Sequence, residues 1–174
     1  MNIDEIYIKI LTTEDDSKLI ELAKSEVMVI PFLVELMLNN EDCRAQNLLI
    51  KLSEQTPLLV YPYFNYIAQA FEKYNNFLAW NSWRIIANLL IVDYLEMWED
   101  IKDKYFSAFK SENITEILAL VSTAKSVINH KPNDAKIVTK LVKDCVNNQF
   151  TICNEPAPHI NAVAKQAVDD FFNN

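Results

Sequence analysis

Glycine is absent from all 174 residues of the chain. It is the residue that reaches positive φ without steric cost, and phosphate-cradling loops, dinucleotide-binding turns and two-residue β-hairpins depend on it. Its absence argues against most nucleotide-binding architectures and against a sheet built from tight hairpins. It favours helices that are joined by turns of Asn, Asp, Ser and Pro.

Histidine and cysteine are scarce: the chain has two histidines and three cysteines. His130 and His159 have no Ser or Cys nucleophile near them in the sequence, so no hydrolytic triad is indicated. A metal ion could in principle be surrounded by Cys145, Cys153, Glu155 and His159, but these residues lack Cys-x-x-Cys or His-Glu-x-x-His spacing. We therefore expect no catalytic residues, no metal site and no cofactor.

Long apolar runs and an excess of positive charge are also missing. The longest apolar runs, Val27–Leu38 and Ile85–Val92, are too short to span a membrane. The net charge is −8, and acidic residues outnumber basic ones in both halves. Because nucleic acids and anionic lipids are bound by clusters of Lys and Arg, this balance argues against both as partners, although it leaves room for a local basic strip.

Two further features indicate the compartment. The acidic segment Met1–Glu5 lacks the positive charge that begins a signal peptide. Three cysteines make an odd number without the spacing of a disulfide framework, which fits a reducing compartment. We therefore expect a cytoplasmic protein.

Helical periodicity extends along nearly the whole chain. Apolar residues recur at spacings of three and four in about ten segments, and none alternates with period two for long enough to be a convincing strand. Hydrophobic residues make up 51% of the chain, enough to fill a core. The sequence therefore predicts one all-α domain over residues 1–174.

Local signals predict where several helices begin. The acidic turn Glu14–Asp16 favours a helix start because carboxylates interact favourably with a helix N-terminus. Asn113, followed by Glu116, has the form of a capping box, and Asn40 is predicted to cap the fourth helix. Pro62 predicts a kink or a second start in the segment that follows.

Residues 30–52 carry a repeat-like pattern. A helix with an early Pro31 is followed by an acidic turn that ends at Asp42, and then by a second helix that opens Cys43-Arg44-Ala45. The opening recurs 40 residues later around Arg84, and Tyr61-Pro62 repeats the proline position. This pattern resembles a HEAT repeat, although the arginine is lost beyond residue 113.

The resemblance implies an armadillo-like α-solenoid, a right-handed α-α superhelix of about four to five helix pairs. A compact irregular bundle is the alternative. In HEAT proteins, residues at the places of Asp42, Arg44 and Arg84 usually form a ladder of hydrogen bonds between repeats. The other interpretation is that the concave face binds a ligand through Arg44, Asn47, Lys51, Trp80, Asn81, Arg84 and Asn88.

Trp80 is the best candidate for an exposed anchor, because polar residues flank it and Trp, Tyr and Arg dominate interface hot spots. A core position is the other interpretation. We expect a non-catalytic scaffold that holds a protein or peptide on the concave face. One alternative is an enzyme of the DNA-alkylation-repair type, since some base-excision glycosylases resemble stacked HEAT-like repeats. Another is a subunit of a larger assembly, including a homo-oligomer, that continues the solenoid through an exposed apolar end.

Overall fold

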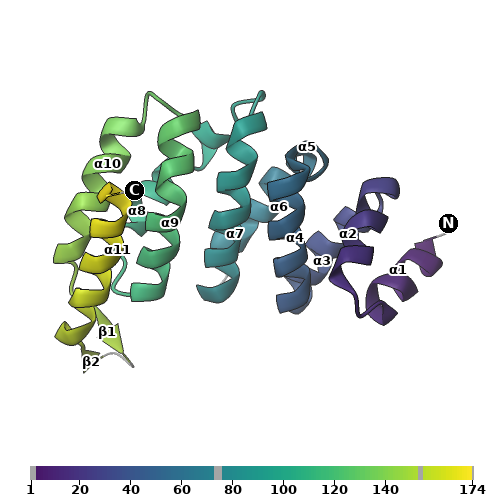
Figure 1. Cartoon of the computed structure of the whole chain (residues 1–174), viewed down its shortest axis with the longest axis horizontal. Coiled ribbons are helices and arrows are strands. Elements are labelled where there is room, and N and C mark those ends of the chain that lie inside the picture. The colour runs from purple at the N-terminus through teal and green to yellow at the C-terminus, as the bar shows by residue number, and fades with distance from the viewer. Residues whose placement is uncertain (1–2, 73–75, 153–154, 174) are drawn as a thin grey trace. The chain divides into compact units, whose positions relative to one another are not determined.

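The computed structural model describes residues 3–72, 76–152 and 155–173, and most of them are helical (Figure 1). The predicted all-α class is therefore confirmed. The chain divides into two compact units, Met1–Asp93 and Tyr94–Asn174, here called the first and second units. A single domain over residues 1–174 stays a prediction. Within the described residues, no helix is both long and apolar enough to cross a membrane.

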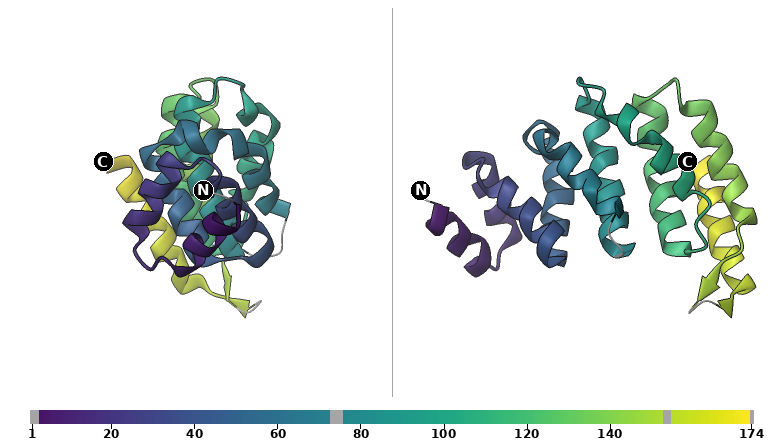
Figure 2. Two further views of the ribbon diagram at one scale, coloured as in Figure 1. Left: turned by 90° about the vertical axis from the view of Figure 1, so that its right-hand side faces the viewer. Right: turned by 180° about the vertical axis from the view of Figure 1, so that it is seen from behind.

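The first unit is built from two layers of helices. In order, its elements are α1 (Ile3–Thr12), α2 (Asp16–Ser25), α3 (Val29–Asn40), α4 (Cys43–Gln55), α5 (Pro57–Val60), the 3-10 turn η1 (Tyr61–Tyr63), α6 (Phe64–Ala68), η2 (Gln69–Glu72), α7 (Asn76–Leu89) and η3 (Leu90–Val92). Helices α2, α4 and α7 lie side by side, and α3 and α6 form a layer behind them (Figure 1). The right-hand view of Figure 2 shows that second layer from its own side. Along the chain, α2, α3, α4, α6 and α7 thus alternate between the two layers.

The second unit is arranged around its longest helix. Its elements are η4 (Met97–Asp100), α8 (Lys102–Ala108), α9 (Ile114–His130), α10 (Ala135–Asp144), η5 (Cys145–Asn147), β1 (Thr151–Ile152), β2 (Glu155–Pro156), η6 (Pro158–Ile160) and α11 (Asn161–Asn173). Helix α9 packs against α8, α10 and α11. The antiparallel pair β1–β2 was not predicted, because two-residue strands are too short to show alternation.

Side-chain caps begin three of these helices. Asp15 accepts a hydrogen bond from Ser17 N at 2.9 Å, and Asn113 accepts one from Thr115 N at 2.9 Å, so both predicted starts are confirmed. The prediction that Asn40 caps the fourth helix is wrong, because Asn40 is the last residue of α3. Asp42 caps α4 instead, and its carboxylate accepts from Ala45 N at 2.7 Å.

Glutamate occupies both left-handed backbone positions in the described part of this glycine-free chain. Glu41 has φ 54° and ends α3, and Glu96 has φ 55° and precedes η4. The left-handed conformation costs a residue with a Cβ atom about 1 kcal/mol. Because Glu41 turns the chain here, the capping position moves to Asp42.

The second unit buries polar groups inside its aromatic core. Trp98 and Tyr105 are both buried and meet edge to face, with ring centroids 5.2 Å apart. Trp98 Nε1 donates to the buried Asp134 carboxylate at 2.8 Å, and Tyr105 Oη donates to Leu120 O at 3.1 Å. Burial raises the pKa of Tyr105 far above its usual value, so this hydroxyl stays protonated.

Candidate binding surfaces

Two amide side chains fix the register between α4 and α7. Asn81 Nδ2 donates to Gln46 Oε1 at 2.7 Å, and Asn88 Nδ2 donates to Ser53 Oγ at 2.9 Å. Both pairs are 35 residues apart in the sequence, and they lie two helical turns apart along each helix. The two helices therefore run parallel. Asn81 and Asn88, two of the seven predicted binding residues, act here in helix packing.

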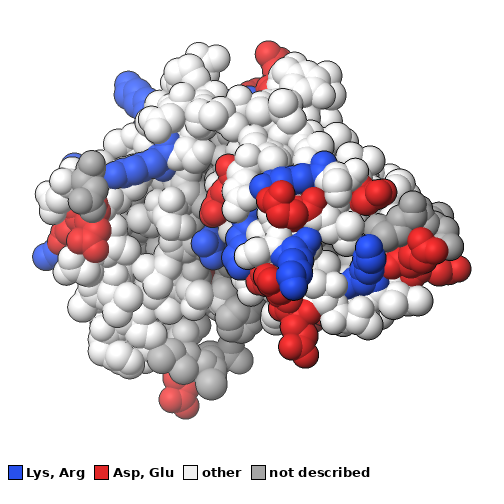
Figure 3. Space-filling view, turned by 45° about the vertical axis from the view of Figure 1, so that its right-hand side comes forward, with Lys and Arg blue, Asp and Glu red and all other residues white. Residues whose placement is uncertain are grey.

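Asp16 links α2 to α4 by accepting bonds from two cations. Arg44 Nε donates to Asp16 Oδ1 at 3.1 Å, and Lys51 Nζ donates to Oδ2 at 3.0 Å. Arg44 also donates to the carbonyl of Thr13. The hydrogen bonds from Lys51 and then Arg44 lower the pKa of Asp16 below its ordinary value. On the side of the molecule shown in Figure 3, Lys and Arg side chains lie directly beside Asp and Glu side chains.

The remaining three predicted residues have different environments. Trp80 is only 7% exposed, so the expectation of an exposed anchor is wrong. Helix α7 packs against α4, α5 and α6, and most of its residues from Leu78 to Leu89 are buried. Asn47 and Arg84 are exposed, and neither forms a hydrogen bond or ion pair with another described residue. These two residues remain accessible to a partner.

Sequence reasoning missed the acceptors of this polar network. Gln46 and Ser53 are buried polar residues seven positions apart on α4, and Asp16 was noted only as part of a helix start. Two polar side chains seven residues apart lie on the same face of a helix, and on an otherwise apolar face this spacing could have predicted the network. Buried polar groups need partners, so such a pair indicates a neighbouring helix that supplies them.

A groove of about 410 Å³ lies in the second layer of the first unit, between α3 and the segment from η1 to α6. Tyr63 is half-buried in its wall, whereas Tyr66 is 58% exposed. Glu35 is exposed at the groove and makes no ion pair with any described residue. Val34 and Leu38, which are both buried, complete the apolar lining. The groove thus combines tyrosine rings, aliphatic surface and one carboxylate.

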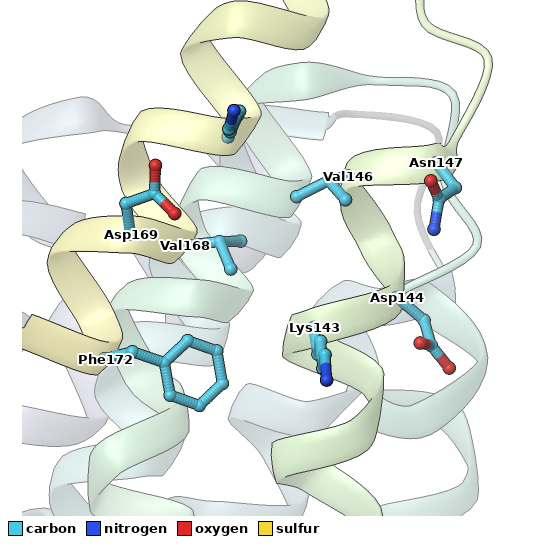
Figure 4. Close-up of a pocket in the computed structure, with 8 residues that line it drawn as sticks. Lys143, Asp144, Val146, Asn147, Val168, Asp169 and Phe172 are labelled. Carbon is cyan, nitrogen blue, oxygen red and sulfur yellow. The ribbon is translucent and has the colours of Figure 1, made fainter.

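A larger groove, about 520 Å³, lies in the second unit between α11 and the end of α10 with η5 (Figure 4). Val146 and Val168 face each other across it, and Phe172 projects toward the side of Lys143 (Figure 4). Charged side chains border this apolar surface: Lys143, Asp144, Lys165 and Asp169. No pattern in the sequence predicted this groove.

No group of three or more His, Cys, Asp or Glu side chains is placed to hold a metal ion in residues 3–72, 76–152 and 155–173. Of the residues considered for a metal, Cys153 lies outside the described residues. Cys145 is a buried free thiol, and burial raises its pKa to about 11, so it is protonated at neutral pH. His159 and Glu155 are exposed.

Comparison with known proteins adds no relative. No protein-family model matches the chain, and no curated protein or solved structure is significantly similar to it. The resemblance to HEAT repeats therefore depends on the residues around Pro31, Arg44 and Arg84 alone.

Proposed function

We propose that the chain is a non-catalytic scaffold of HEAT-like helix pairs that binds a segment of another protein on its first unit. The observation that carries this proposal is the tyrosine-lined groove between α3 and α6. The parallel packing of α4 and α7, with its constant separation of 35 residues, supports a repeat of stacked helix pairs. A right-handed superhelix is the arrangement that such stacking favours.

The groove has the composition of a protein-binding site. Tyrosine is enriched among hot-spot residues because it supplies a large contact area and a hydroxyl at low entropic cost. Tyr66 offers most of its ring to solvent, and Glu35 offers a carboxylate without an ion pair among the described residues. Apolar surface with few polar groups is also the usual composition of small binding sites.

The polar strip on α4 and α7 has a smaller part in this proposal. Arg44, Lys51, Asn81 and Asn88 already bond to other side chains of the first unit. Asn47 and Arg84 remain as exposed groups on that face, and we assign them the role of secondary contacts.

Two related points follow from the same residues. The glycosylase alternative has less support than the scaffold, because Trp80 and Trp83, the tryptophans near Arg84 in the sequence, are both buried and so cannot stack on a damaged base. Cys43 and Cys145 are free thiols, which supports a reducing compartment, and we place the protein in the cytoplasm.

Affinity capture with quantitative mass spectrometry tests the proposal. The groove variant Glu35→Lys/Tyr66→Ala changes two exposed residues of the site. Its matched control, Glu54→Lys/Tyr94→Ala, makes the same changes at exposed positions outside the groove. Losing two hot-spot contacts of about 2 kcal/mol each weakens binding at least tenfold.

We expect a protein that wild type and control both retain and that the groove variant loses, with equal helicity of all three by circular dichroism. If the groove variant and its control capture the same proteins in the same amounts, the groove is not the binding site. A third variant, Asn47→Glu/Arg84→Glu, tests the strip, and a loss confined to it would transfer the site to α4 and α7.

A further inference from the structure

We propose that the chain associates head to tail with a second copy of itself, with α1 of one copy docked in the groove between α10 and α11 of the next. This contact uses neither the α3–α6 groove nor the polar strip. The proposed association can therefore be tested independently of the proposed function.

Helix α1 exposes an apolar face in addition to the one that it buries. Ile6 and Ile10 are buried, and α1 packs against α3. Ile8 and Leu11, three residues apart on the other side, are each 57% exposed, and Tyr7 beside them is partly exposed. Single exposed hydrophobic residues are normal, but adjacent ones on one helix face mark an interaction site.

The α10–α11 groove offers a surface of matching character and length. Val146 and Phe172 supply its accessible apolar surface, with Phe172 half exposed, and the buried Val168 lies beneath them. The α11 residues that line it run from Lys165 to Phe172, a length of about 11 Å along the helix axis. The ten residues of α1 span about 15 Å, so one face of α1 covers the whole groove.

Charge is distributed in a way that favours the same contact. Lys136, Lys140 and Lys143 are spaced four and three residues apart, so they form one exposed stripe along α10, and Lys165 stands across the groove. None of these four lysines forms an ion pair with a described residue. Among the residues that line the groove, Asp144 and Asp169 balance Lys143 and Lys165, so the excess positive charge next to it comes from Lys136 and Lys140 on the α10 stripe.

The head of the chain has the opposite sign. Asp4, Glu5, Glu14 and Asp15 are exposed in and just after α1, and Lys9 is the one basic residue between them. The first unit as a whole has 13 acidic and 7 basic residues, whereas the second has 11 and 9. An acidic helix with exposed Ile and Leu thus exists on the same chain as an apolar groove that lies beside the lysine stripe of α10. This complementarity favours a second copy as the occupant.

A head-to-tail contact joins two different surfaces, so a dimer still has one free groove, on the copy that contributes its α1, and one free α1, on the copy that contributes its groove. Such an interface produces open oligomers that grow with concentration unless the symmetry closes into a ring. The contact is small, which places it among weak interfaces. Association is therefore expected only at high protein concentration.

Sedimentation velocity of the full chain, up to ~1 mM, tests the proposal. The head variant is Ile8→Asp/Leu11→Asp, and the groove-side variant is Lys143→Glu/Phe172→Asp, all at exposed positions. A control, Lys110→Glu/Leu58→Asp, makes similar changes at exposed positions elsewhere. We expect the wild type and the control to grow in mass with concentration, and each of the two interface variants to associate at least tenfold more weakly.

Mixing the two interface variants gives the decisive result. The head variant keeps an intact groove and the groove-side variant keeps an intact head, so an equimolar mixture forms a 1:1 dimer and nothing larger. A wild type that stays monomeric overturns the proposal, as does a mixture that fails to dimerise. Both variants should still capture the partner of the α3–α6 groove, which separates this test from that of the proposed function.

Discussion

The two units use their charged and polar side chains in different ways. In the first unit, Asp16 ties α2 to α4, and the amides of Asn81 and Asn88 tie α7 to α4. In the second, the Trp98–Asp134 hydrogen bond lies inside the core, and the lysines of α10 make no ion pair within the described residues. Polar groups at the borders between helices set helix register in the first unit. In the second unit, the lysines of α10 form a charged surface that is available to a partner.

The largest expected effect is on the core of the second unit. Trp98→Ala removes a fully buried ring and should destabilise the chain by about 4 kcal/mol. Trp98→Phe keeps most of the ring but leaves the buried Asp134 carboxylate without its indole donor, so we expect a loss of about 2 kcal/mol. Urea unfolding followed by circular dichroism measures both. A Phe variant as stable as the wild type would show that the hydrogen bond contributes nothing, whereas equal losses in the two variants would show that the ring volume kept by Phe contributes nothing.

The helix-register contacts of the first unit should each contribute less. Asn81→Ala removes the donor to the buried Gln46 side chain, and we expect a destabilisation of about 1.5 kcal/mol. The matched change Asn47→Ala, at an exposed position of α4, should stay within about 0.5 kcal/mol. The same urea experiment compares them. If the two variants are equally stable, the amide contacts do not hold α4 and α7 in register.

The sequence predicted most helices of both units because their signals are local. Apolar spacing and the caps Asp15 and Asn113 act within a few residues, and the structure confirms them. The cap of α4 was misplaced by two residues because Glu41, which turns the chain, has none of the glycine signal that usually marks a left-handed position.

Contacts between helices were harder to predict, because register is a property of two helices together. The sequence pattern aligns Arg44 with Arg84, 40 residues apart, whereas the hydrogen bonds join residues 35 apart, such as Gln46 and Asn81. Trp80 has polar neighbours in the sequence, but its burial depends on α4, α5 and α6. The grooves depend on distant segments in the same way.

The Asp16 cluster gives the first unit a dependence on pH. Its pKa is lower in the folded chain than its ordinary value of 3.8, so the carboxylate stabilises the fold above that value. The contribution is lost as the pH falls through the folded pKa. Because the side chain is a third exposed, solvent screens the pair and we expect no more than about 1 kcal/mol.

Comparing wild type with Asp16→Asn checks this sign. The stability difference should be constant between about pH 5 and 7, shrink below about pH 4, and fall in high salt. The charge-retaining variant Asp16→Glu should recover part of the difference. A difference that grows as the pH falls would mean that the ion pairs with Arg44 and Lys51 do not stabilise the folded chain.

The smallest effect compares the two left-handed glutamates, one in each unit. Asn tolerates this conformation better than Glu, so Glu41→Asn and Glu96→Asn should each stabilise the chain by about 0.5 kcal/mol. Glu41 is the sharper case, because it ends α3 and its carbonyl accepts from Gln46 at 3.1 Å, a bond that the substitution retains. Thermal unfolding of both variants, with Glu54→Asn as an exposed control inside α4, measures the effect. The control should lower stability slightly, because Asn is a poorer helix former than Glu. Gains at both left-handed sites and a loss at the control would show that the missing glycines cost both units stability at the same kind of backbone position.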